Sequence, residues 1–304
     1  MSSPTTGPEG TSTAGGEVTA RINHRPDPAD LAGAPRPWVW LSVAAGVLSA
    51  AGCVAGLLAP GTIYGRETRA LADAATAQDL VGLIVVAPLL VGLAVGASRD
   101  ALHPWLCWLG CLGFTAYNYA IYAFSIHFGP LFLLWVAVLG LSLFALIGGL
   151  VALQLRALSD RAGVGGVRWV GWFLVAVAVL FGLLWLREIV PDLLAGRGST
   201  SAADWRVPTN PVHVLDLAFF LPAVFVSGLA LLRSRWLGYA TAAGQLTFLA
   251  LTCLPVLVTP VVAQVRGHTP VWSAVGPVGV LFLATAFVLW RFLRSVSGAA
   301  VDPA

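Results

Sequence analysis

The sequence predicts an all-α protein, a polytopic membrane helix bundle of about eight transmembrane helices. Hydrophobic residues make up 58% of the 304 residues and charged residues only 10%, whereas a water-soluble domain needs about 25% charged residues to cover its surface. The apolar residues also fall into stretches of about 20 residues, the length that crosses the hydrocarbon core of a bilayer. We therefore expect lipid to be the solvent for much of the exterior.

The chain divides into three predicted parts. Residues 1–37 are rich in Ser, Thr, Pro and Gly, so we expect a disordered cytoplasmic tail there. Residues 38–293 form the bundle, and residues 294–304 form a short cytoplasmic C-terminal tail. The expected spans are 38–58, 79–97, 105–124, 131–153, 169–186, 212–232, 238–262 and 274–293. They are expected to be helical because lipid offers no partner for unpaired backbone groups.

The arginines predict the orientation. All 17 basic residues are arginines, and with a cytoplasmic N-terminus 11 of them fall on the cytoplasmic side and six outside. This bias favours both termini in the cytoplasm. The abundance of Ala, Gly and Arg suggests a bacterial plasma membrane. The net charge of +3 gives no reason to expect nucleic acid as a partner, and the oligomeric state is not indicated.

An even number of helices permits a 4+4 parallel repeat. Asp79 and Asp216 lie near the starts of the second and sixth spans, and Pro88 and Pro222 lie within them. The alternative is chance similarity between segments rich in Ala, Gly and Leu.

Polar residues line one face of the third span at helical spacing. They are Cys107, Cys111, Thr115, Asn118, Tyr122 and Ser125. Such a stripe indicates either a helix–helix contact or a lined cavity. The seventh span carries a similar line with the same two interpretations, made of Thr241, Gln245, Thr252 and Thr259.

His213 and Asp216 are three residues apart at the start of the sixth span, so they share a helix face. This pair could bind a metal, relay a proton or hold a polar ligand. Alternatively it belongs to a helix start, where Asn210 is a good N-cap and an acidic group complements the helix dipole.

His127 lies after the third span, on the same membrane side as His213. With Asp216, these two histidines are weak candidates for a metal site, and the alternative is a solvated loop histidine. Phosphate-loop, zinc-protease and nucleophile-elbow motifs are absent from the sequence, and no cofactor is indicated.

The chain also resembles a family of uncharacterised bacterial membrane proteins. The resemblance rests on residues 63–68, 78–81, 117–124 and 127–133, which read IYGRET, QDLV, YNYAIYAF and HFGPLFL. That family has no assigned activity, so the resemblance implies a membrane protein and no particular site residues.

Taken together, these patterns predict a plasma-membrane protein with an outward-facing polar pocket that binds or transports a small polar solute or ion. The expected pocket residues are Arg66, Glu67, Asp79, Asn118, Tyr122, His127, His213 and Asp216. Two alternatives remain open. One is an accessory or scaffold protein without its own ligand, and the other is a membrane-embedded enzyme with His213 and Asp216 as acid/base groups.

Overall fold

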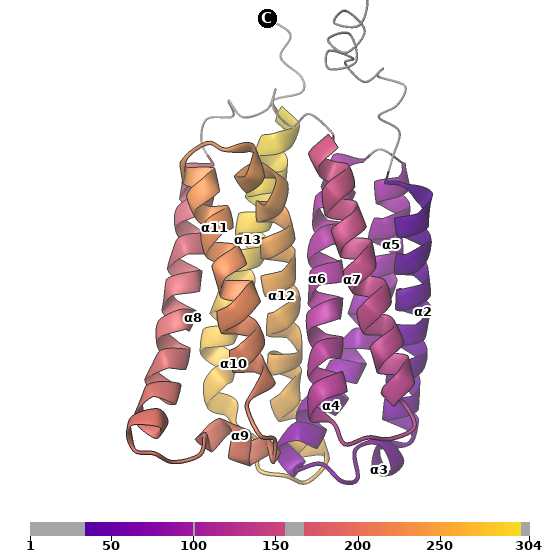
Figure 1. Cartoon of the computed structure of the whole chain (residues 1–304), viewed down its shortest axis with the longest axis vertical. Coiled ribbons are helices and arrows are strands. Elements are labelled where there is room, and N and C mark those ends of the chain that lie inside the picture. Colours follow the sequence, from indigo (N-terminus) through magenta and orange to yellow (C-terminus); the bar gives the residue numbers. More distant parts are fainter. Residues whose placement is uncertain (1–33, 100, 156–166, 299–304) are drawn as a thin grey trace, which may run out of the picture. The chain divides into compact units, whose positions relative to one another are not determined.

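The computed structural model describes residues 34–99, 101–155 and 167–298, which belong to one compact unit. These residues form helices and connections (Figure 1), and the predicted disordered tail lies outside them up to residue 33. The α-helices are α2 (Arg36–Leu58), α3 (Pro60–Ile63), α4 (Arg69–Val81), α5 (Ala87–Ser98), α6 (Leu102–Ser125), α7 (Phe132–Leu155), α8 (Arg168–Leu194), α9 (Thr200–Trp205), α10 (Pro211–Leu215), α11 (Leu221–Leu232), α12 (Trp236–Val265) and α13 (Val275–Gly298). The π-helical turns η2 (Gly82–Val86) and η4 (Asp216–Phe220) join α4 to α5 and α10 to α11, and the 3-10 turn η5 (Trp272–Ala274) precedes α13.

Seven helical segments in the described part of the chain are long and apolar enough to cross a membrane. They are Arg36–Leu58, Arg69–Ser98, Phe132–Leu153, Arg168–Leu194, Pro211–Leu232, Trp236–Val265 and Trp272–Val296. The prediction of an all-helical, multi-pass membrane protein in contact with the lipid bilayer is therefore confirmed. The remaining long helix, α6, has 24 residues and carries the polar stripe. Protein surrounds much of it, since Leu106 and Trp108 have no exposed surface.

Two spans begin or end well outside their predicted bounds. The second starts at Arg69 instead of residue 79, because Thr68 caps the helix by accepting a hydrogen bond from the Leu71 N–H at 3.3 Å. The fifth continues to Leu194 instead of residue 186. Polar residues that suggested loops are thus helical, and Asp73, Asp79 and Asp192 among them are buried. In particular, Asp79 lies ten residues inside its helix, about 15 Å along the axis at 1.5 Å per residue.

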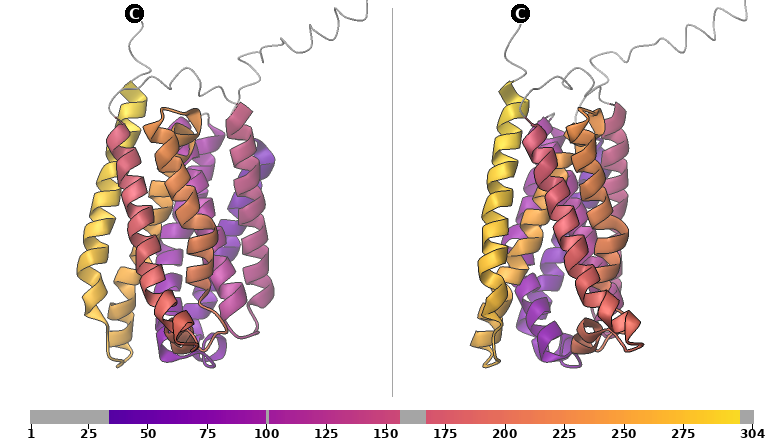
Figure 2. Two further views of the ribbon diagram at one scale, coloured as in Figure 1. Left: turned by 60° about the vertical axis from the view of Figure 1, so that its left-hand side comes forward. Right: turned by 90° about the vertical axis from the view of Figure 1, so that its left-hand side faces the viewer.

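The helices form two groups (Figures 1 and 2). One contains α2, α5, α6 and α7, and the other contains α8, α11, α12 and α13. The groups meet where α6 crosses α12, and there a Cβ on Gly110 would collide with the Gly244 carbonyl oxygen. The α4 helix also packs against α12. α13 lies at the edge of the bundle in both views of Figure 2 and is the least buried of the seven segments.

The two ends of the bundle carry different helix termini and connections. The start of α2 and the end of α13 lie at one end (Figure 1). The connections 59–68, 126–131, 195–210 and 266–274 lie at the other. We call the latter the loop end, and most of the predicted pocket residues are on it or within three turns of it.

The predicted repeat receives mixed support and stays a prediction. In both groups the second span contains a π turn with a proline two residues after it, which pairs Pro88 with Pro222. This pairing places Asp79 opposite His213, three residues away from its predicted counterpart Asp216. The groups also differ, because α2 packs on α7 while α8 and α13 make no comparable contact in the described residues.

Candidate functional site

Asp79 is 3% exposed and lies on the side of α4 that faces α2 and α6. Its Oδ2 accepts a hydrogen bond from the Tyr64 hydroxyl at 2.7 Å, and its Oδ1 forms a hydrogen bond with the Tyr122 hydroxyl at 2.9 Å. Gly56 on α2 makes room for the carboxylate, because a Cβ there would collide with Asp79 Oδ2. Burial raises the pKa of the Tyr64 phenol well above its ordinary value, so this hydroxyl remains a donor. Both oxygens of a buried carboxylate are thus held by neutral groups.

Aromatic stacking fixes the tyrosine that bridges α4 and α6. The Tyr122 ring stacks on Trp135 of α7, with ring centroids 5.4 Å apart and planes at 16°. It also stacks on Tyr64 at 6.5 Å and 22°. A second bond runs from the Tyr122 hydroxyl to the Ala75 carbonyl oxygen at 3.0 Å. Nearby, Tyr119 donates to the Ser49 hydroxyl on α2 at 3.0 Å. The hydroxyl of Tyr122 therefore has a defined position between Asp79 Oδ1 and the Ala75 carbonyl oxygen.

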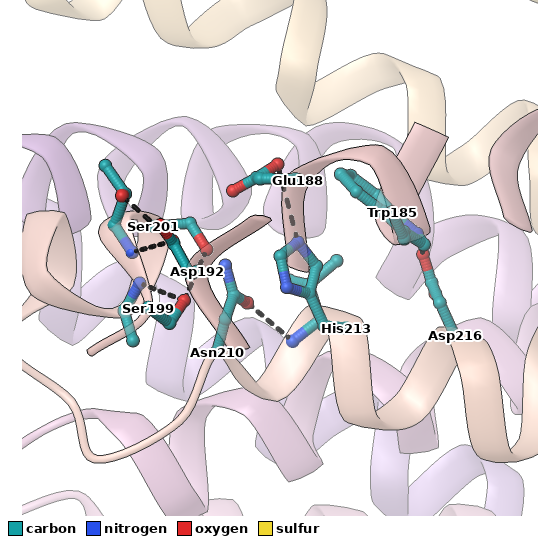
Figure 3. A network of polar contacts seen from close by, with 11 residues as sticks. Trp185, Glu188, Asp192, Ser199, Ser201, Asn210, His213 and Asp216 are labelled. Carbon is teal, nitrogen blue, oxygen red and sulfur yellow. Dashed lines mark hydrogen bonds and ion pairs between the residues drawn. The ribbon is translucent and has the colours of Figure 1, made fainter. Parts of the chain in front are cut away.

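Asp216, at the first residue of η4, has a similar environment (Figure 3). It is 7% exposed, and it accepts a hydrogen bond from the Tyr117 hydroxyl at 2.9 Å and one from Trp185 Nε1 at 2.8 Å. His213 packs on the Trp185 ring with centroids 4.6 Å apart, and its Nε2 lies 3.7 Å from Glu188 Oε2. His213 and Asp216 therefore face the same helix, α8, but each has its own partner there.

The predicted helix start is confirmed. Asn210 is the N-cap of α10, and its side chain accepts a hydrogen bond from the Val212 N–H at 2.9 Å. At the end of α8, Asp192 accepts bonds from the Arg197 side chain at 3.0 Å and from the Thr200 N–H at 2.9 Å. The connection between α8 and α10 is thus held by carboxylate and amide caps.

Arg66, Glu67 and His127 join two connections at the loop end. The Glu67 carboxylate accepts a hydrogen bond from the His127 N–H at 2.9 Å and lies 3.0 Å from His127 Nδ1. Arg66 donates to the Phe128 carbonyl oxygen at 3.5 Å. The Glu67 side chain is fully buried, whereas that of His127 is half exposed. These contacts fix the end of the bundle and do not open toward the deeper carboxylates.

Asp73 is a third buried carboxylate, and its partners are basic. It is 4% exposed and contacts Arg266 Nη1 at 3.1 Å and His268 Nδ1 at 2.7 Å. This ion pair ties α4 to the end of α12. Asp73 and Asp79 lie six residues apart on one helix and are equally buried, yet their partners differ in charge.

The weak metal candidates do not come together. His127 pairs with Glu67, His213 pairs with Glu188, and Asp216 is held by Tyr117 and Trp185. Among the described residues, no group of three or more His, Cys, Asp or Glu side chains could hold a metal ion. The geometry therefore gives no support to a metal site built from these residues.

A cavity of about 220 Å³ lies between α4, α6 and α12, near the loop end. Asn118 and Tyr122 line it, whereas the six other predicted pocket residues do not. Its wall is mostly apolar. The lining residues are Leu71, Ala74, Ala75, Gln78, Phe114, Tyr117, Asn118, Ile121, Tyr122, Ile126, Trp205, Val212, Thr252, Pro255, Val256 and Thr259.

Few polar groups on this wall are free to bind. The Thr252 and Thr259 hydroxyls donate to carbonyl oxygens of their own helix. The Tyr117 hydroxyl is hydrogen-bonded to Asp216, and the Tyr122 hydroxyl is hydrogen-bonded to Asp79. The amides of Gln78 and Asn118 remain, and within residues 34–99, 101–155 and 167–298 neither forms a hydrogen bond with another residue. Gln78 is only 8% exposed and lines the cavity, and its amide is not among the fully buried atoms that lack a partner in the described residues.

A second cavity of about 650 Å³ lies on the other side of α6, between α7, α11 and α12. Its wall is also largely apolar, with Gln245 and the hydrogen-bonded pair Ser227 and Thr241 among the few polar residues. Tyr117 lines both cavities. Both interpretations of the polar stripes thus hold in part, since some members line cavities while Cys111 and Thr115 lie buried at helix contacts.

Sequence reasoning missed Tyr64, Trp185 and Gln78. Tyr64 and Trp185 are 15 and 31 residues from the carboxylates that they contact, so helical spacing could not connect them. Gln78 directly precedes Asp79, and its polar character inside an otherwise apolar run was the available signal. Comparisons with models of protein families, with curated proteins and with solved structures each gave no match, so no relative contributes to the interpretation of the site.

Proposed function

We propose that this membrane protein binds a small, uncharged amphiphilic molecule in the cavity between α4, α6 and α12. The two unpartnered amides on an otherwise apolar wall carry this proposal. Gln78 is buried and Asn118 half-buried, and a bound polar group would supply hydrogen-bond partners for both amides on this apolar wall. The apolar wall favours a ligand that is apolar over most of its surface. We therefore propose an amphiphile as the ligand, in place of the small polar solute or ion predicted from the sequence.

The two deep carboxylates do not make the cavity ionic. Asp79 and Asp216 lie behind Tyr122 and Tyr117 and are hydrogen-bonded to the hydroxyls of these tyrosines. A charged ligand would lose its hydration on entering the cavity and would find no opposite charge on the wall. This desolvation would cost several kcal/mol. We therefore propose a neutral polar group that both donates and accepts, such as an alcohol or an amide. Binding followed by release to either side of the membrane would make the protein a transporter of this solute.

Thermal unfolding of the purified protein tests this proposal. Small uncharged amphiphiles should raise the melting temperature, whereas sugars, amino acids and metal ions should not. The rise should be lost in Asn118→Leu and retained in Gln245→Leu, a matched amide on the other cavity. In the absence of ligand, Gln78→Leu and Asn118→Leu should leave the protein at least as stable as wild type, since each removes an unpaired polar group.

Two outcomes would contradict the proposal. One is that no compound stabilises the protein, and the other is that stabilisation survives every cavity substitution. Either would favour the alternative of an accessory or scaffold protein without its own ligand. The enzyme alternative gains nothing from the geometry, because both Asp216 oxygens are occupied by Tyr117 and Trp185.

We also propose eight spans, with α6 as the eighth, and both termini in the cytoplasm of a bacterial cell. Two features support this topology: α6 is as long as its neighbours, and the arginine bias favours this orientation. Labelling of single cysteines in intact cells tests it. A membrane-impermeant thiol reagent should modify Gly61→Cys at the loop end and spare Ser234→Cys at the opposite end, and the reverse pattern would invert the orientation.

A further inference from the structure

Apart from Asp204, which is exposed, the described carboxylates fall into two classes by their partners. Arg or His side chains contact Glu67, Asp73, Glu188 and Asp192. In contrast, Asp79 and Asp216 are held by tyrosine hydroxyls and a tryptophan N–H. A buried carboxylate that lacks a cationic partner is expensive in its ionised form, especially within a membrane-spanning helix. The two classes therefore raise the question of which carboxyl groups carry a proton.

The hydrogen count at Asp79 answers this question for one of them. Three oxygen–oxygen contacts meet at Tyr122 and Asp79: Tyr64 Oη to Asp79 Oδ2 at 2.7 Å, Tyr122 Oη to Asp79 Oδ1 at 2.9 Å, and Tyr122 Oη to the Ala75 carbonyl oxygen at 3.0 Å. The two tyrosines supply only two hydrogens, since each hydroxyl has one. A third hydrogen is needed for three full hydrogen bonds, and the Asp79 carboxyl group is the group that can supply it.

We propose that Asp79 is a proton-binding site and carries a proton in this structure. The Asp79 carboxyl O–H then donates to Tyr122 Oη, the Tyr122 O–H donates to the Ala75 carbonyl oxygen, and the Tyr64 O–H donates to the other Asp79 oxygen. When Asp79 releases its proton to water, the Tyr122 hydroxyl turns from Ala75 to the carboxylate. This proposal does not rest on the binding of an amphiphile in the cavity.

Among the described residues, none of the groups that face Asp79 is a cation that would replace the proton. From α2 it faces the Cys53 thiol, from the α3–α4 connection Tyr64, and from α6 Tyr119 and Tyr122. Of the other packed helices, α9 carries Asp204, which is exposed, and α12 carries Tyr239 and Cys253; Arg206 and Arg266 directly follow these two helices. Arg266 is held by Asp73, about 9 Å along α4 from Asp79 at 1.5 Å per residue.

Asp216 serves as an internal comparison. It has two contacts, from Tyr117 and Trp185, and those groups supply two hydrogens. No third contact requires a further hydrogen. The hydrogen count therefore singles out Asp79.

Infrared spectroscopy of the purified full-length protein tests the proposal, because a protonated carboxyl group has a C=O band separate from that of a carboxylate. We expect a band that is lost at alkaline pH, is absent in Asp79→Asn and persists in Asp73→Asn. Tyr122→Phe should move the band to higher frequency, since the acceptor of the carboxyl hydrogen is gone. A spectrum of Asp79→Asn that keeps every protonated-carboxyl band of the wild type would overturn the proposal.

A second measurement covers the case in which Asp79→Asn does not fold. Isotope-labelled aspartate in the wild-type sequence should shift the same band, and Tyr122→Phe in the labelled protein should shift it again. The proposal that Asp79 is protonated and donates to Tyr122 would be wrong if labelled aspartate shifts no protonated-carboxyl band, or if Tyr122→Phe leaves that band unchanged.

Discussion

Replacing Asp73 or Asp79 by asparagine gives a matched pair of variants. Both carboxylates lie on α4, and they are 4% and 3% exposed. We expect Asp73→Asn to destabilise the protein clearly and Asp79→Asn to change its stability little. The difference arises from the partners, since asparagine is uncharged but has nearly the shape of a protonated aspartic acid.

The magnitudes follow from the contacts. Asp73→Asn removes the charge opposite Arg266 and His268, and a hydrogen bond to a charged group contributes about 1.5–3 kcal/mol. Both basic side chains are 27% exposed, so water recovers part of the loss and we expect a cost of about 2 kcal/mol. Asp79→Asn retains an acceptor for Tyr64, and its NH₂ group can donate to Tyr122 Oη, so the cost should be below about 0.5 kcal/mol.

Thermal unfolding in detergent, followed by tryptophan fluorescence, measures both variants under one condition. The melting temperature of Asp73→Asn should fall by several degrees, while that of Asp79→Asn should stay within about one degree of wild type. An equal loss in the two variants would refute the reasoning, because it would show that Asp79 needs its negative charge. A larger loss of melting temperature in Asp79→Asn than in Asp73→Asn would refute the reasoning as well.

Two further substitutions test the packing around the deep carboxylates. Gly56→Ala places a methyl group against Asp79 Oδ2 and should destabilise the protein by about 1–3 kcal/mol, whereas Gly92→Ala, with open space around it, should have little effect in the same unfolding measurement. Trp185→Phe removes the N–H donor of Asp216 and should cost about 1–3 kcal/mol, and equal stability of this variant and wild type would show that the bond is not needed.

Helices could be predicted from the sequence because length and apolarity are properties of one segment at a time. The start of α10 was predictable for the same reason, since Asn210 and the backbone that it caps are neighbours. The start of α4 could not be predicted from the sequence. A polar helix segment such as Arg69–Val81 resembles a loop until the helices that cover Asp73 and Asp79 are known.

The hydrogen-bond partners of the predicted pocket residues could not be identified from the sequence, because several of them lie far away along the chain. Helical spacing placed His213 and Asp216 on one face, and they do face α8 together. It could not show that Trp185 contacts both residues, with its ring against His213 and its N–H donating to Asp216. Similarly, Glu67 and His127 lie on the expected side of the bundle, but they satisfy each other.

Depth explains why the carboxylates differ in their partners. At the loop end, Arg266 and His268 keep part of their surface in contact with solvent while they bind Asp73, so the ion pair is only partly desolvated. Deeper in the bundle, an arginine beside Asp79 would bury a second charge completely. A tyrosine hydroxyl gives a hydrogen bond there without a charge, and by rotating it can donate to the ionised carboxylate or accept from the protonated carboxyl group. Since Tyr122 also forms part of the cavity wall, a ligand that moves its ring would change the hydrogen bonds of Asp79, and the two events would be thermodynamically linked.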